Sequence, residues 1–167
     1  MSLLDLYLDM YPGSNNVLVE SRFAQYFEYL RSVESRLPTN ARQFAAASWH
    51  YDHQDHRCPH DSWLETLTIT EPSSGTRHEI RSVSILIRLL GSYHDGHLEL
   101  RYENVRHYSV AHNSSVRKLP ASSGHGDWLI DEISVADSGS LVHEILFRGG
   151  YKWKIESEEI LADWQGL

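Results

Sequence analysis

The sequence predicts an α+β fold, with an antiparallel meander sheet of about six strands and N-terminal helices packed on one face. Apolar residues recur at steps of three and four before residue 48, which is typical of helices. After residue 63 they recur at steps of two, which is typical of strands. Short turn sequences separate the alternating segments, and successive hairpins of this kind form an antiparallel meander.

The 167 residues are expected to form one domain, with a helical part (residues 1–48), a histidine-rich connector (49–62) and a β-rich part (63–164). The one cysteine, Cys58, excludes an internal disulfide and fits a reducing compartment. We find no secretory signal and no apolar run near the ~20 residues that span a bilayer. We therefore expect a cytoplasmic protein that does not contact membranes.

The clearest helix is predicted over residues 17–37, and we expect its apolar stripe to pack on the sheet. A shorter helix is predicted over residues 2–10, and another begins near Asn40, which has capping-box spacing to Gln43. The stripe of the long helix consists of Phe23, Tyr26, Phe27, Leu30, Val33 and Leu37.

The predicted strands lie at residues 63–70, 82–89, 98–110, 128–135, 141–148 and 151–157. We expect Asp95-Gly96 to form a two-residue hairpin turn, because both residues of such a turn take a positive φ. Residues 111–126 are rich in Ser, Asn and Gly, and a loop of this length is functional or mobile. Residues 158–164 extend the last strand or form a short helix.

The connector holds five candidate metal ligands. Imidazole and thiolate suit zinc, but these residues lack the spacing of any standard zinc site. Pro59 also keeps His60 off the helical face that His50 and His53 would share. We therefore predict no stoichiometric metal and no cofactor, with zinc as the alternative. The five residues are His50, His53, His56, Cys58 and His60.

Acid–base chemistry has one further candidate in His94, Asp95 and His97. Turn geometry already accounts for Asp95-Gly96, so this sequence is weak evidence for catalysis. The chain carries neither the Gly-x-Ser-x-Gly motif of a nucleophile elbow nor a dinucleotide fingerprint. We therefore favour a non-enzymatic protein.

The formal net charge is −8, and residues 127–163 hold nine acidic residues against three basic ones. Nucleic-acid binding needs a basic surface, so we expect no nucleic-acid partner. Acidic residues beside aromatic ones favour a basic protein partner, because aromatic side chains anchor an interface and charge steers its association. The candidate partner-binding residues are Asp131, Glu132, Glu144, Trp153 and Glu156.

An acidic, one-domain α+β chain of this kind resembles the immunity proteins of bacterial polymorphic-toxin systems, in architecture and charge, over about residues 61–164. The resemblance implies a protein that neutralises a basic toxin by direct binding. Two alternatives stay open. One is a metal-dependent enzyme that uses the connector ligands, and the other is a small-ligand binder that uses a sheet concavity under residues 111–126.

Overall fold

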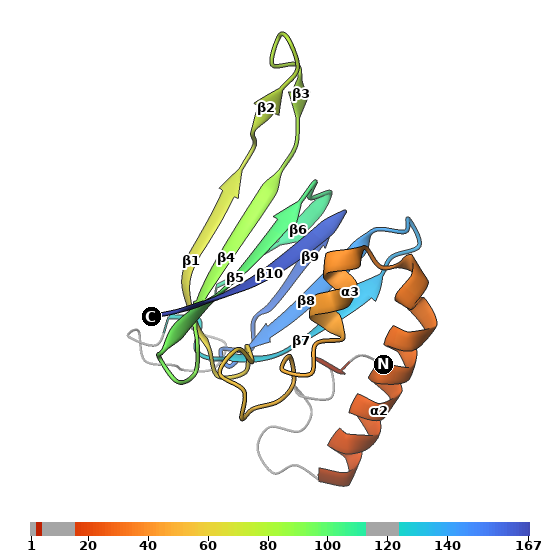
Figure 1. Cartoon of the computed structure of the whole chain (residues 1–167), viewed down its shortest axis with the longest axis vertical. Helices are drawn as coiled ribbons and strands as arrows, with labels where there is room; N and C mark the ends of the chain where they lie inside the picture. Colours follow the sequence, from red (N-terminus) through yellow and green to blue (C-terminus); the bar gives the residue numbers. More distant parts are fainter. Residues whose placement is uncertain (1–2, 5–15, 113–123) are drawn as a thin grey trace.

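The computed structural model describes residues 3–4, 16–112 and 124–167, with helices ahead of strands as expected (Figure 1). Most of the helix predicted over residues 2–10 lies outside the described residues. Helix α2 (Asn16–Val33) leads through the 3-10 turn η1 (Glu34–Arg36) to helix α3 (Thr39–Ala45). The strands are β1 (Trp63–Thr70), β2 (Ser73–Ser74), β3 (Ile80–Arg81), β4 (Ser84–Leu90), β5 (Gly96–Glu103), β6 (His107–Ser109), β7 (Trp128–Val135), β8 (Leu141–Phe147), β9 (Lys152–Ser157) and β10 (Glu159–Gly166).

The α+β class and the antiparallel pairing are confirmed, but two four-stranded sheets replace the single six-stranded meander. The first sheet has the order β1-β4-β5-β10, and the second has the order β6-β9-β8-β7. Strands β2 and β3 form a separate two-stranded ribbon. All of the pairs are antiparallel.

The chain passes between the two sheets at a corner, where Asn104 has a φ of +50°. The pairing continues through the bend. The amide of Arg106 donates to the carbonyl of Glu156 (2.8 Å), and the amide of Glu158 donates to the carbonyl of Glu103 (3.1 Å). Alternation along a strand predicts that the strand exists but not where it changes sheets, which is why a single sheet was expected.

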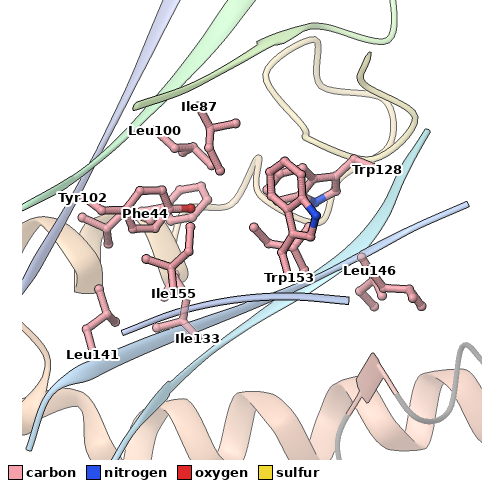
Figure 2. Close-up of a cluster of buried hydrophobic side chains, with 14 of the residues drawn as sticks. Phe44, Ile87, Leu100, Tyr102, Trp128, Ile133, Leu141, Leu146, Trp153 and Ile155 are labelled. Carbon is pink, nitrogen blue, oxygen red and sulfur yellow. The ribbon is translucent and has the colours of Figure 1, made fainter. Parts of the chain in front are cut away.

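The hydrophobic core lies between the inward faces of the two sheets (Figure 2). Ile87, Leu100 and Tyr102 of the first sheet are buried in the same cluster as Ile133 and Ile155 of the second. Full burial of one such aliphatic side chain contributes about 1.5–3 kcal/mol. This shared core holds the sheets together, and Phe44 of α3 enters it as well.

Helix α2 lies beside the edge strand β7 and completes its hydrogen bonding. The Tyr26 hydroxyl accepts from the amide of Ile133 (2.7 Å), and the Tyr29 hydroxyl accepts from that of Val135 (3.0 Å). The predicted stripe is buried at Leu30 but not at Phe27, which is 36% exposed. Among the described helices, none is both long and apolar enough to cross a membrane.

Helix α3 packs on β10, and a carboxylate of that strand caps it. Glu159 accepts hydrogen bonds from the backbone amide of Ala41 (3.2 Å) and from the side chain of Asn40 (3.1 Å). The first amides of a helix have no partner within the helix, so a carboxylate at this end satisfies them and interacts favourably with the helix dipole.

A β-arm, residues 68–81, projects from the first sheet (Figure 1). It consists of the end of β1, strands β2 and β3, and the turn between them, and all of its side chains are exposed. Glu71 and Arg81 form an ion pair across the ribbon (3.9 Å). The arm therefore contributes little to the core.

Candidate functional site

The histidine-rich connector forms a run of tight turns instead of a helix. Backbone amides donate to carbonyls three residues earlier, from His50 to Ala47 and from Cys58 to Asp55, for example. The spacing that would place histidines on one helical face therefore does not apply. His50 and Cys58 point inward, whereas His53 and His56 are exposed.

A buried polar network surrounds Asp131, whose side chain is 1% exposed. The ring nitrogens Nε2 of His50 (2.8 Å) and Nε2 of His143 (2.9 Å) donate to its Oδ2. The indole of Trp128 donates to its Oδ1 (2.9 Å). The network continues to Tyr102, whose hydroxyl lies 2.7 Å from Nδ1 of His143.

The hydrogen-bond acceptors around the His50 ring determine which of its nitrogens carry a proton. His50 faces the carbonyl of Phe44 through Nδ1 (3.1 Å) and Asp131 through Nε2, so both nitrogens must donate and the ring is an imidazolium. His143 contacts Asp131 through Nε2, and its Nδ1 faces the Tyr102 hydroxyl, which can donate or accept. His50 and Asp131 therefore form a buried ion pair.

Burial acts to raise the pKa of Asp131, but the charge of His50 and the hydrogen bonds from both histidines outweigh it and lower the pKa below the ordinary value of 3.8. Burial raises the pKa of the Cys58 thiol to about 12. That thiol donates to the carbonyl of His50 (3.2 Å). The network is thus inaccessible and fully hydrogen-bonded, which fits a role in structure.

The predicted metal ligands are dispersed. His50 binds Asp131, and Cys58 is buried behind it. The rings of His53 and His60 stack on each other at 4.0 Å, and His56 hydrogen-bonds Asp95. Across the described residues, no group of three or more histidine, cysteine or acidic side chains could hold a metal. The alternative of a metal-dependent enzyme has no assembled ligand set in this part of the chain.

The predicted partner-binding residues require a correction. Asp131, Glu132 and Trp153 are buried, so they cannot present their side chains to a partner. Glu144 and Glu156 are half-buried on the second sheet. The prediction for Asp131 was wrong because an acidic side chain was expected to lie on the surface. In the strand, Asp131 shares the inward face with Ile133, two residues later, and both are buried.

The acid–base candidate is also separated. His97 is buried beside Glu65 (3.1 Å), whereas His94 is exposed and packs on Trp63 with ring centroids 4.5 Å apart.

Two cavities bear on the small-ligand alternative. One of about 320 Å³ lies between α2 and β7, and one of about 280 Å³ lies between α3 and β10. The concavity predicted under residues 111–126 falls largely outside the described residues.

Exposed aromatic side chains gather at the end of the molecule opposite the β-arm. Trp63 is 49% exposed and Tyr93 is 50% exposed. The Tyr93 ring stacks on His56 at 4.1 Å, and its hydroxyl donates to the carbonyl of His53 (3.3 Å). We define the loop-end face as His53, His56, Asp61, Trp63, Tyr93, His94, Asp95, Asp127 and Arg148.

The loop-end face is acidic and is held together by polar contacts. It has three carboxylates and only one guanidinium, and Nε of Arg148 lies 2.7 Å from Oδ2 of Asp127. Asp127 also accepts from the Trp63 indole (3.0 Å). Asp61 and His94 adopt positive φ values of 61° and 58°, a strained conformation for residues other than glycine.

Sequence reasoning missed this face because its members come from five separate segments: the connector, the start of β1, the β4–β5 turn, the residue before β7 and the residue after β8. The available signal was a set of aromatic residues and histidines in turns. No protein-family model, curated protein or solved structure matches this chain.

Proposed function

We propose that the protein is a non-enzymatic binding protein that recognises a basic segment of another protein through the loop-end face. One observation carries this proposal: two large aromatic side chains stay half-exposed beside carboxylates. Burial of aromatic anchors is the main source of affinity in many interfaces, and half-exposed rings retain the area for it.

The chemistry of the face fits arginine and lysine side chains. A guanidinium or ammonium group stacks favourably on the ring of a tryptophan or tyrosine. Asp61 and Asp95 are about half-exposed on the same face, so they can pair with such cations. The net charge of −8 would also speed the approach of a basic protein.

The resemblance to immunity proteins makes this proposal more specific. In that case the basic partner is a bacterial toxin, and the protein neutralises it by direct binding. The acidic net charge and the α+β architecture support this specific form. The loop-end face replaces the strand residues first expected to form the interface.

Co-expression with the toxin candidate of the neighbouring reading frame tests both the binding function and the immunity role. We expect the wild type to restore growth and to form a complex with the toxin candidate. Tyr93→Ala should weaken the complex by about tenfold or more, as loss of an interface anchor does. The matched control is Tyr108→Ala, which removes a tyrosine that is 42% exposed on β6, away from the face.

The outcomes distinguish the position of the interface, the binding function and the immunity role. A complex that both alanine variants weaken equally would place the interface elsewhere. Binding without growth rescue would keep the binding function but remove the immunity role. If the wild type binds no product of a neighbouring gene and gives no rescue, the immunity role has lost its support.

Rising salt should slow association, because screening shortens the reach of surface charges to about 8 Å at physiological ionic strength.

A further inference from the structure

Strand β1 is the terminal strand of the first sheet, and its outer edge is largely unpaired among the described residues. It pairs with β4 on one side. On the other side the described residues form only one bridge with it, between Trp63 and Asp127 at its beginning. An open edge of this kind presents free backbone donors and acceptors, to which another strand can add.

The open part of the edge is uncharged and nearly palindromic. Residues 66–70 read Thr-Leu-Thr-Ile-Thr, with Thr68 at the centre. The stretch is rich in β-branched residues and contains no proline or glycine, which favours strand pairing. Ile69 lies within it and is 38% exposed. A strand that reads the same in both directions is complementary to an antiparallel copy of itself.

The features that normally block edge pairing lie on either side of this stretch. A register shift between Leu64 and Thr66 makes Glu65 a bulged residue. The Glu65 carboxylate lies near His97 (3.1 Å) and Arg88 (3.6 Å) of its own sheet. On the other side, Glu71 is followed by Pro72, which cannot donate to a ladder. Pairing is therefore confined to residues 66–70.

We propose that two copies of this chain associate by antiparallel pairing of their β1 edges around a two-fold axis at Thr68. In this register Thr68 faces Thr68 of the second copy, and Thr66 faces its Thr70. Leu67 faces Ile69 of the second copy, so the exposed part of Ile69 gains an apolar neighbour. An interface with two-fold symmetry must be complementary to itself, and the palindrome meets that condition. This inference does not depend on the proposed function.

The register also predicts a weak dimer. Glu65 stands opposite Glu71 of the second copy, although each has a cationic neighbour in its own chain, at 3.6 Å from Arg88 and at 3.9 Å from Arg81 respectively. Five paired residues bury far less than the ~1,200 Å² typical of stable interfaces. We therefore expect dimers to form in the range of about 10 µM to 1 mM.

Sedimentation of the full chain across that concentration range tests the proposal. The mass of the wild type should rise from one chain towards two. Thr68→Lys should abolish the rise, because it places two ammonium groups at the symmetry axis. The matched control is Thr76→Lys, at the exposed tip of the β-arm, which should dimerise like the wild type. A wild type that stays monomeric throughout would overturn the proposal.

A cross-link tests the register itself. Thr68→Cys should form a disulfide-linked dimer on mild oxidation, because facing residues in an antiparallel pair bring their Cβ atoms to about 4.5–5.5 Å. Thr76→Cys should not cross-link at the same rate. The native Cys58 is buried and does not compete. Dimerisation that survives Thr68→Lys, without cross-linking of Thr68→Cys, would place the interface elsewhere and refute the edge.

Discussion

At the scale of single residues, Asp131 departs most from the behaviour expected of its type. It lies in an acidic stretch, yet it is the centre of the buried network and binds two imidazoles and an indole. Removing one partner of a buried ion pair is costly, because the other charge stays in the interior without compensation.

Asp131→Asn should lower the free energy of unfolding by about 3–5 kcal/mol, the usual cost of breaking a buried ion pair. The substitution keeps the size of the side chain but leaves the His50 imidazolium without a counter-charge. Urea unfolding measures the change. Asp137→Asn is the matched control, because Asp137 lies in an exposed turn, where a substitution shifts stability by less than about 0.5 kcal/mol.

The pH dependence of this difference has a definite sign. The folded-state pKa of Asp131 is lowered below 3.8, so its carboxylate stabilises the fold fully above that value. The contribution is lost as the pH falls through the folded-state pKa. The gap between the wild type and Asp131→Asn should therefore narrow below about pH 4. A gap that stays constant down to acid unfolding would mean that the lost stability is not electrostatic.

The sequence could not distinguish the histidines from one another. His50 and His53 have the spacing of helical neighbours, but the connector turns so tightly that one ring is buried and the other is exposed. Partial burial and then the neighbouring His60 lower the pKa of His53. The partner of His50 is Asp131 and the partner of His60 is Leu129, about 70–80 positions later in the chain, so no local pattern could predict these environments.

At the scale of elements, periodicity located most helices and strands but not the reasons for particular turns. The prediction that Asp95 and Gly96 form a turn with two positive φ values was wrong. Gly96 is the first residue of β5 and does not have a positive φ, whereas His94 does. Gly96 is instead required by Trp164, since a Cβ at this position would lie 2.3 Å from the indole.

Gly96→Ala should therefore lower the free energy of unfolding by about 1–3 kcal/mol, as overpacking of a tight contact does. Gly166 provides a matched control. It pairs with Gly96 in the same ladder, but an added Cβ there would meet nothing within 4 Å. Thermal or urea unfolding of both alanine variants measures the difference. Equal stability of the two variants would show that the Trp164 indole moves aside at no cost.

At the scale of the whole molecule, the two sheets and both helices share one core, and the β-arm lies outside it (Figure 1). The sequence predicted the hairpin of β1 and β4 but gave no sign that its tip would project. Alternation continues into the arm at Ile69 and Ile80, and both are exposed there. Whether an apolar strand residue is covered depends on the length of the neighbouring strands, which a local pattern does not contain.

Hydrogen exchange should separate the β-arm from the core. A two-stranded ribbon alone is marginally stable in water, so the amide of Ile80, which pairs with Ser74, should exchange through local opening. Amides of Ile87 and Leu100 lie in central strands with fully buried side chains and should exchange at least about 100-fold more slowly. The measurement belongs at dilute concentration, where β1 pairing between copies is absent. Arm amides as protected as those of β4 would mean that the arm packs against a surface even in the single chain.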